Sequence, residues 1–300
     1  MENIDLDNQN SEFWNELCGT RTAIDLGVVD DSKESIELFD DYFFKFYPYI
    51  KKYIPYKLLK EKKILEIGIG YGSVSEKLFN SSAVYNAVDI SNGPLEFIKH
   101  RANFYNKKVN TKNASAKELP FESEIFDAVI SIGCLHHTGD LKKSIDEVNR
   151  VLKIGGSIHI MLYSSHSWRQ LISRPRLWFR ELFFSKHEYY ERNILEAERA
   201  KYDANSENLV APHVSLTSYS DVRNLLSNFE ITKIASENGD LQTFMVHWIA
   251  RFYKYILRNE LSFKDRLYLG LKLRKIVCPL MNFKGIGTDI YFTAKKISNG

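Results

Sequence analysis

The stretch Leu65-Glu66-Ile67-Gly68-Ile69-Gly70-Tyr71-Gly72 joins a short apolar segment to three glycines at alternate positions. Glycine at such a turn lets the backbone bend sharply and approach a ligand closely. A dinucleotide-binding turn has the pattern GxGxxG, in which the third glycine stands three positions after the second. That position is Ser73 here, and Gly72 falls one residue early. The stretch therefore predicts a strand-to-helix turn that binds a ligand other than NAD.

Short apolar segments separated by helical stretches continue on the carboxyl side of this turn. They are KKILEI (62–67), AVYNAVDI (83–90), IFDAVISI (125–132) and GSIHIMLY (156–163), and two later ones are FEITKIAS (229–236) and TDIYFTAKK (288–296). Strands that alternate with helices are typical of a parallel sheet. The fold class is therefore expected to be α/β.

Two helices are predicted from apolar periodicity. The first precedes the sheet and carries apolar side chains at Phe39, Phe43, Phe46, Ile50 and Ile54. The second spans 141–152 and is expected to stop at Lys153 and Gly155-Gly156. A further helix is expected from Ser220 to Leu226.

Two insertions rich in aromatic and basic residues, 164–217 and 241–283, follow strand ends. Ligands of open α/β sheets bind outside the carboxyl ends of the strands, so we expect these insertions to form a lid over the substrate. Extra helices that widen the core, or docking on a membrane surface, are alternatives for the second. We expect a single domain, 1–300, because no linker divides the chain. Its other parts are an N-terminal helical cover (1–60), a cofactor-binding half (61–163), and the remaining strands and helix (218–240 and 284–300).

Asp89 stands at the end of the second predicted strand, downstream of the glycine turn. A carboxylate at this place can accept hydrogen bonds from both ribose hydroxyls of an adenosine ligand. The alternative is a tight turn followed by an aspartate that caps a helix. The spacing of turn and carboxylate favours the nucleoside site.

With these features the chain resembles the class I S-adenosylmethionine-dependent methyltransferases of the bacterial small-molecule type. Glu66-x-Gly68-x-Gly70-x-Gly72 is similar to their first motif, and Asp89 matches their acidic residue after strand two. Segments 116–121, 126–127, 133–137 and 150–156 are similar to later motifs, so the resemblance covers roughly 60–163. It implies a Rossmann-like seven-stranded sheet with helices on both faces. It also implies S-adenosylmethionine as cofactor and S-adenosylhomocysteine as product.

The same resemblance implies which residues bind the cofactor. They are Glu66, Gly68, Gly70, Gly72, Asp89, Ile90, Ser115, Ala116, Gly133 and Cys134. Glu66 is implied to orient the loop and the amino group of the ligand. Family members commonly have Asp where Ser115 stands, so we expect altered adenine contacts, from the Ala116 backbone or from the amide of Asn113.

His136 and His137 follow the predicted strand 125–132, at the edge of the sheet that faces the cofactor. A hydroxyl acceptor must lose its proton during attack, and histidine, with an ordinary pKa of about 6.5, suits this task. We expect His137 to be the general base and keep His136 as second candidate. The alternative is a structural role, in capping the next helix or packing against the cofactor.

Polar residues cluster in the first insertion, from Arg199 to His213. Loops with such residues often contact substrate, so Tyr202, Asp203, Asn205 and His213 are expected to bind the acceptor. A solvated connection is the alternative. Near the N-terminus, Phe13, Trp14 and Tyr42 are candidates for an aromatic cover over the cofactor, or are ordinary core.

Composition limits the partners. With 41 basic and 38 acidic side chains the net charge is only +3, so no global field favours nucleic acid or an anionic membrane. The chain begins with a polar, acidic segment, and no apolar run approaches the roughly 20 residues of a membrane span. We expect a cytoplasmic protein without stable membrane insertion. Cys18, Cys134 and Cys278 form no cluster with His, so no metal is expected.

The expected function is methyl transfer from S-adenosylmethionine to oxygen on a small polar metabolite or sugar-like acceptor. One alternative is methylation of carbon on a quinone-like or aromatic ring, because quinone-biosynthesis methyltransferases share the first motif and a histidine after strand four. A non-catalytic subunit, which either binds an adenosyl ligand or serves as a scaffold, is another. Nucleic-acid methylation is disfavoured because the chain has no dense basic stripe and no Pro-Pro-Tyr motif after strand four. The sequence does not indicate the oligomeric state.

Overall fold

The computed structural model describes residues 2–176, 178–179, 189, 191–238, 241–280 and 286–299. Parts of both predicted insertions (177, 180–188, 190 and 281–283) lie outside this description, as does the side chain of Cys278. Within the described residues, none of the helices has the length and apolar character needed to cross a bilayer.

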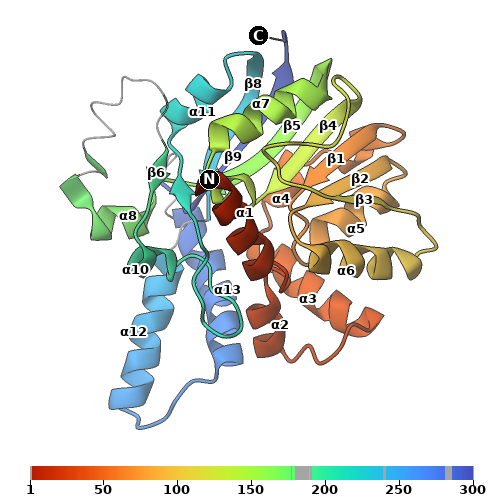
Figure 1. Cartoon of the computed structure of the whole chain (residues 1–300). Coiled ribbons are helices and arrows are strands. Elements are labelled where there is room, and N and C mark those ends of the chain that lie inside the picture. Colours follow the sequence, from red (N-terminus) through yellow and green to blue (C-terminus); the bar gives the residue numbers. More distant parts are fainter. Residues whose placement is uncertain are drawn as a thin grey trace.

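Seven strands form one sheet in the order β3-β2-β1-β4-β5-β9-β8, as the resemblance implied (Figure 1). They are β1 (Lys63–Ile67), β2 (Val84–Asp89), β3 (Asn110–Asn113), β4 (Phe126–Ile132), β5 (Leu152–Tyr163), β8 (Phe229–Glu237) and β9 (Asp289–Lys296). The first five pair in parallel, and β9 runs antiparallel between β5 and β8. The strand order reverses between β1 and β4, where open sheets bind ligands.

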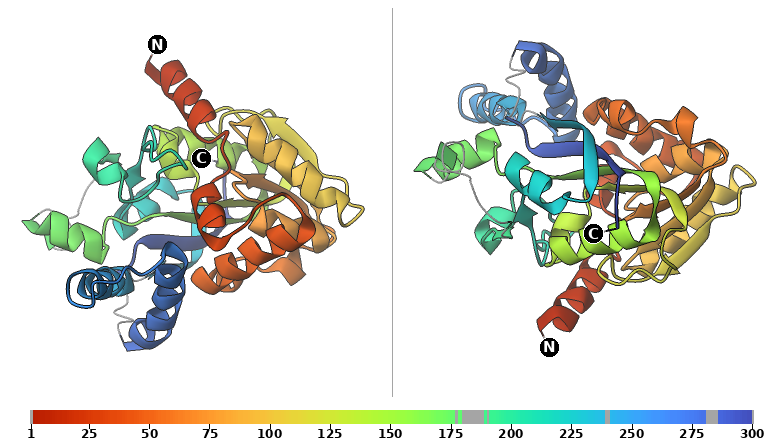
Figure 2. Two further views of the ribbon diagram at one scale, coloured as in Figure 1. Left: turned by 90° about the horizontal axis from the view of Figure 1, so that it is seen from below. Right: turned by 90° about the horizontal axis from the view of Figure 1, so that it is seen from above.

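Helices cover both faces of the sheet (Figure 2). The helices whose bounds are described are α1 (Glu2–Phe13), α2 (Thr20–Leu26), α3 (Lys33–Phe46), α4 (Ile50–Tyr53), η1 (Tyr56–Leu59), α5 (Ser73–Asn80), α6 (Asn92–Asn103), η2 (Leu135–His137), α7 (Leu141–Val151), α8 (Trp168–Ser173), α10 (Glu196–Arg199), α11 (Tyr219–Leu225), α12 (Leu241–Tyr255) and α13 (Phe263–Leu280). A small antiparallel pair, β6 (Arg192–Asn193) and β7 (Ser215–Leu216), stands apart from the main sheet.

The alternation of side chains along the strands creates two cores. In β1, Leu65 and Ile67 join the core under α7 and α11, whereas Ile64 joins the core under α4, α5 and α6. All three side chains are almost fully buried. A strand that is apolar on both faces in this way is typical of a parallel sheet covered on both sides.

The helix predicted through Phe39 to Ile54 is divided into α3 and α4. The chain leaves the helical conformation at Tyr47, where φ is −115° and ψ is 58°. Tyr47 precedes Pro48, and the residue before a proline is sterically disfavoured from helix. The prediction of one continuous helix was therefore wrong.

The prediction that Gly155-Gly156 ends α7 was wrong. The helix ends at Val151, and β5 begins directly at Leu152. The pairing of β4 with β5 shifts register between Phe126 and Ala128, and Gly155 has φ +80°. The glycines thus belong to an irregularity within the strand, a usual place for glycine in a sheet.

The guanidinium of Arg101, on α6, holds three other elements together. Its side chain is fully buried, and Nη2 donates to Asp40 Oδ2 on α3 at 2.5 Å and to Glu76 Oε2 on α5 at 2.7 Å. Nη1 donates to the carbonyl oxygen of Tyr71 in the glycine turn at 2.8 Å. Asp40 also accepts from Ser73 Oγ at 2.5 Å. One buried cation therefore fixes the turn against α3, α5 and α6.

We expect Arg101→Met to lower the free energy of unfolding by about 3–5 kcal/mol, because it leaves two buried carboxylates without their cation. Urea unfolding measures this loss. Lys99→Met on the same helix is the control, since the Lys99 side chain is 47% exposed and should change stability by only about 0.5 kcal/mol. Equal effects of the two substitutions would contradict the importance of the buried network.

Candidate cofactor and acceptor site

A cavity of about 730 Å³ opens at the carboxyl ends of β1, β2, β4 and β5. Its volume is in the usual range for small-molecule sites, about 300–1,000 Å³. The predicted residues that line it are Glu66, Gly68, Gly70, Gly72, Asp89, Ile90, Ser115, Ala116, Gly133, Cys134, His137, Tyr202 and Asp203. Residues from four strand ends and from the first insertion thus meet in one cavity.

The glycine turn has a backbone that other residues rarely adopt. Gly68, Gly70 and Gly72 have φ of +75°, +55° and +77°. A Cβ atom on Gly68 would lie 2.3 Å from Cβ of Cys134. The turn therefore needs glycine for its conformation and, at Gly68, for its close contact with the loop after β4.

Asp89 lines the cavity, and two backbone N–H groups hold its carboxylate in place. Oδ2 accepts from Ile69 N at 2.9 Å, and Oδ1 accepts from Ser91 N at 3.0 Å. Each carboxylate oxygen has further lone-pair capacity for a ligand hydroxyl. The arrangement fits a ribose-binding carboxylate.

Burial raises the pKa of Asp89 from its ordinary value of 3.8 to about 6, against hydrogen bonds from Ser91, Ile69 and Ile90 that lower it. Because its pKa is raised, folded Asp89 binds its proton more tightly than the unfolded chain does. The stability gained in this way is fully present below about pH 3.8 and is lost as the pH rises through about 6. The ionised carboxylate is thus poorly solvated at neutral pH. Ligand hydroxyls that donate to it would offset this cost.

Glu66 lies at the cavity wall, but its carboxylate is also engaged by the protein. Oε2 accepts from Tyr85 Oη at 2.5 Å. Burial raises the pKa of Glu66 to about 7, against the hydrogen bond from Tyr85. Glu66 is therefore held by Tyr85 of β2 beside the glycine turn.

The loop after β3 has few side-chain groups to offer to an adenine ring. Ser115 Oγ accepts from Lys117 N at 3.3 Å. The Asn113 amide donates to the carbonyl oxygens of Ile90 at 2.8 Å and Asp89 at 3.2 Å. Because the Asn113 amide group is used inside the protein, Ser115 and the backbone of Ala116 remain the available groups.

Helix α1 and the residues after it bridge the ends of β2 and β4. Asn10 Nδ2 donates to the carbonyl oxygen of His137 at 2.8 Å, and Ser11 Oγ donates to that of Ile90 at 3.0 Å. Asp7 pairs with Lys117 at 2.8 Å. Asp7, Asn10 and the predicted Trp14 line the cavity, as does Tyr42 from α3, whereas Phe13 is not among its lining residues.

His137 is oriented by a backbone carbonyl. Its Nδ1 lies 2.7 Å from the oxygen of His213, so Nδ1 carries the proton and donates it there. In the neutral ring Nε2 is then the free nitrogen, and it lies 3.7 Å from Asp203 Oδ2. Burial lowers the pKa of His137, while Asp203 acts in the opposite direction. His137 thus presents an unprotonated nitrogen near a carboxylate.

Asp203 completes this polar end of the cavity. Its Oδ1 accepts from Tyr163 Oη at 3.0 Å, and its Oδ2 has no hydrogen-bond partner among the described residues. Burial raises the pKa of Asp203, against the effect of His137. Tyr163 was not predicted, although its place at the end of the strand GSIHIMLY was a signal that it faces the site.

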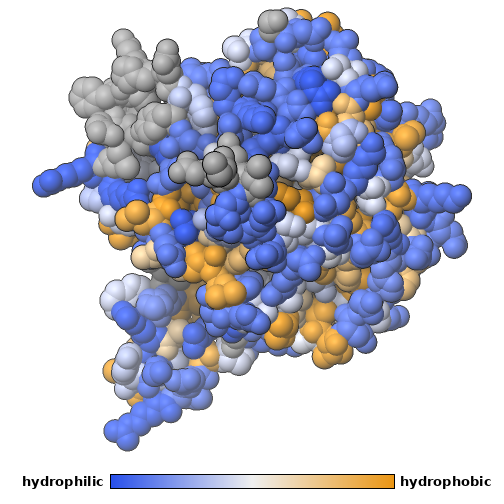
Figure 3. All heavy atoms as spheres, viewed as in Figure 1, coloured by the Kyte–Doolittle hydropathy of each residue, from blue (hydrophilic) through white to orange (hydrophobic). Residues whose placement is uncertain are grey.

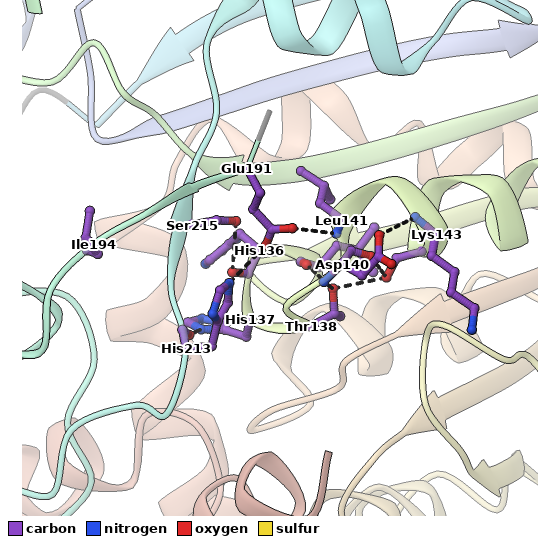
Figure 4. Close-up of polar contacts among 12 residues, drawn as sticks. His136, His137, Thr138, Asp140, Leu141, Lys143, Glu191, Ile194, His213 and Ser215 are labelled. Atoms are coloured by element: carbon purple, nitrogen blue, oxygen red, sulfur yellow. Dashed lines mark hydrogen bonds and ion pairs between the residues drawn. The ribbon is translucent and has the colours of Figure 1, made fainter. Parts of the chain in front are cut away.

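Three predicted site residues do not line the cavity. His136 is fully buried under Tyr163, with ring centroids 4.0 Å apart. The amide oxygen of Asn205 accepts from the backbone of Glu207 and Leu209 and closes a turn. His213 faces Glu191, with Nε2 2.9 Å from Oε1 (Figure 4).

The other end of the cavity is mostly apolar, and its individual lining residues other than Tyr42 were not predicted. Residues from α3, α12 and α13 line it: Phe39, Tyr42, Phe43, Phe46, Val246, His247, Ala250, Arg266, Leu267 and Gly270. The sequence predicts an N-terminal helical cover over 1–60, and the α3 residues Phe39, Phe43 and Phe46 line the cavity. This end of the cavity, the apolar chamber, therefore lies between the N-terminal helices and the second insertion.

No group of three or more His, Cys, Asp or Glu side chains in the described parts of the chain is arranged to hold a metal ion. Cys18 and Cys134 are free thiols.

We expect Gly68→Ala to lower the free energy of unfolding by about 1–3 kcal/mol more than Gly27→Ala. Gly27 has a similar φ of +84°, but a Cβ atom there meets nothing within 4 Å. The two variants therefore share the backbone strain and differ in the clash with Cys134. Equal losses in urea unfolding would refute the role assigned to close packing.

Part of the chain is similar to known proteins. Residues 65–160 match a family model described as a methyltransferase domain. Over 105 residues the chain is 39% identical to the demethylmenaquinone methyltransferase of Clavibacter sepedonicus, covering 35% of this chain and 42% of that protein. It is also 28% identical over 108 residues to the ubiquinone biosynthesis O-methyltransferase of Coxiella burnetii, covering 36% of this chain and 46% of that protein. The matches thus span less than half the length of these two relatives.

A crystal structure of a SAM-dependent methyltransferase from Methanosarcina mazei has the same fold. The TM-score is 0.52 at 17% identity, over 84% of this chain and 98% of that one. The sheet order, the glycine turn with its carboxylate, and the matched segment point to one conclusion. Residues 65–160 match the methyltransferase domain, and the chain has the fold of S-adenosylmethionine-dependent methyltransferases.

Proposed function

We propose that this chain transfers the methyl group of S-adenosylmethionine to a hydroxyl of an acceptor with an apolar or aromatic body, and that His137 is the general base. The observation that carries the proposal is the free Nε2 of His137, fixed by the His213 carbonyl at the wall of the cavity. When bound, the cofactor supplies an electrophilic methyl group.

The proposed roles in the cofactor half follow from the hydrogen-bonding capacity described above. Asp89 accepts from the ribose hydroxyls, and Gly68, Gly70 and Gly72 admit the ligand close to the backbone. Glu66 holds the turn and the amino group. Ser115, with backbone groups of Ile90, Ala116, Gly133 and Cys134, forms the rest of the wall. These roles fit the donors and acceptors that line the cavity.

In the acceptor half, Nε2 of His137 takes the proton that leaves the hydroxyl during attack. Burial lowers the pKa of His137, so the ring is neutral and able to accept this proton at neutral pH. Asp203, at 3.7 Å, would stabilise the positive charge that then develops on the ring. Tyr163 holds Asp203 in place, and Tyr202 also faces the cavity.

The apolar chamber supports an acceptor with an aromatic ring or hydrocarbon body rather than a polyhydroxylated one. Four aromatic side chains of α3 line it, together with Val246, Ala250 and Leu267. Small-molecule sites generally bind the apolar part of a ligand through such walls and orient it by a few polar groups. We propose that α12 and α13 form the lid of this chamber.

Methylation of carbon on a quinone-like ring is the second candidate. The same chamber suits a ring, and one relative is named a demethylmenaquinone methyltransferase. Transfer of labelled methyl from S-adenosylmethionine to a panel of phenols and hydroquinones tests both candidates. The position of the label separates oxygen from carbon methylation.

We expect calorimetric titration to show binding of S-adenosylhomocysteine that Asp89→Ala weakens by roughly 100-fold, as two hydrogen bonds to a charged group are lost. A urea unfolding curve of the variant distinguishes lost binding from unfolding. A folded variant with unchanged affinity would contradict the role of Asp89, and a parent protein without affinity would favour a scaffold role.

We expect His137→Asn to slow methyl transfer by roughly 10²–10⁴-fold while S-adenosylhomocysteine still binds, because Asn retains a donor for the His213 carbonyl and lacks the base. His136→Phe is the control, since His136 does not line the cavity. It should alter the rate only a few-fold. Equal effects of both substitutions would indicate that the pair is structural.

The rate should rise with pH as His137 loses its proton and then become constant. Because burial lowers the pKa of His137 below its ordinary 6.5, the rising limb should lie below pH 6.5. The pH profile of kcat/KM measures this limb, which His137→Asn should abolish. A limb above pH 7 that persists in the variant would assign the base elsewhere.

A further inference from the structure

Helix α12 exposes a stripe of large apolar side chains along its outer side. Met245, Trp248, Phe252 and Tyr255 recur at helical spacing and are 36%, 67%, 53% and 71% exposed. Ile256 and Leu257, which follow the helix, are 65% and 53% exposed. Aromatic side chains are rarely left in water at such density without a binding role.

A different side of the same helix lines the cavity. Val246, His247 and Ala250 face the apolar chamber, and α12 packs against α13. The two helices project from the rest of the molecule as a hairpin (Figure 1). In the part of the chain that the structure describes, the outer stripe is thus largely exposed and belongs to none of the core clusters.

Basic side chains accompany the stripe. Arg251, Lys254 and Arg258 are exposed, and Glu260, the acidic residue between 248 and 260, pairs with Lys254 at 2.7 Å. Arg251 lies over the ring of Trp248, 6.0 Å from its centroid. Figure 3 shows the projecting hairpin with hydrophobic and hydrophilic residues side by side on its surface. The surface thus combines apolar side chains with a local positive charge.

We propose that this surface of α12, together with residues 256–258, docks on the surface of a lipid bilayer that carries anionic phospholipids. An interfacial helix buries aromatic and aliphatic side chains at the headgroup boundary and keeps cations beside it, as here. Each Lys or Arg near an anionic leaflet contributes attraction that salt screens. The net positive charge of the tip favours such a bilayer over a second copy of the same positively charged surface.

Docking would place the lid helices of the cavity at the bilayer boundary. Val246 and Ala250, which line the chamber, lie within one helical turn of Trp248 on the docking side. An acceptor dissolved in the bilayer could therefore enter the chamber without crossing water. Binding to vesicles is independent of methyl transfer, so the proposal stands or falls separately from the proposed function.

Vesicle co-sedimentation of the full chain tests the surface. We expect binding to phosphatidylglycerol–phosphatidylcholine vesicles that weakens with added salt, and little binding to phosphatidylcholine alone. The double variant Trp248→Ser with Phe252→Ser should lower binding by about tenfold or more. Val29→Ser with Leu58→Ser is the matched control, since these exposed apolar residues (86% and 76%) lie outside the hairpin and their loss should leave binding unchanged.

A charge variant tests the contribution of the basic side chains to vesicle binding. Arg251→Gln with Arg258→Gln should weaken binding to the anionic vesicles, whereas the exposed pair Lys107→Gln with Lys108→Gln should weaken it less. Brominated phospholipid should quench tryptophan emission in the parent protein, and Trp248→Phe should remove most of this quenching while vesicle binding persists. This result does not depend on a disruptive substitution.

Three outcomes would overturn the proposal. They are failure of the parent protein to bind anionic vesicles at low salt, binding that the Trp248 and Phe252 variant retains, and a dimer in analytical ultracentrifugation that the same variant abolishes. The last would identify a second copy as the occupant of the surface.

Discussion

The buried guanidinium of Arg101 is the contact on which the cofactor half depends. It neutralises Asp40 and Glu76 and donates a hydrogen bond to the Tyr71 carbonyl oxygen, so that a turn of three positive-φ glycines is held between three helices. Such a turn has little intrinsic preference for one conformation, because glycine is permissive. Its shape is therefore set by the neighbouring side chains. Arg101 thus determines the geometry of the cavity wall although it does not line the cavity.

Much of the architecture could be predicted because it depends on local patterns. The strands β1, β2, β4 and β5 are short apolar runs, and their alternation with helices gave the parallel sheet. The four-residue strand β3 has the sequence NTKN, which no apolar pattern identifies, since it is held only by pairing with β2. Pro48 indicates the break before α4. The apolar periodicity continues across this proline, and it predicted one continuous helix instead.

The candidate site was predictable where it depends on the backbone and on strand ends, as at Gly68 and Asp89. It was not predictable where it depends on contacts between distant segments. Nothing in the sequence of the first insertion distinguishes Asp203, which faces the cavity, from Asn205, which closes a turn. The role of His213 is carried mainly by its carbonyl oxygen, and side-chain chemistry gives no information about that atom.

The position of α1 has a practical consequence for handling the protein. This helix spans the ends of β2 and β4 beside the cofactor half of the cavity, whereas β9 runs antiparallel to β5 and ends at the opposite edge of the sheet. An affinity tag or fluorescent fusion placed ahead of α1 is thus attached to a helix whose residues Asp7 and Asn10 line the binding site. The same addition after β9 lies a full strand length away, which makes the carboxyl side the appropriate place for immobilisation.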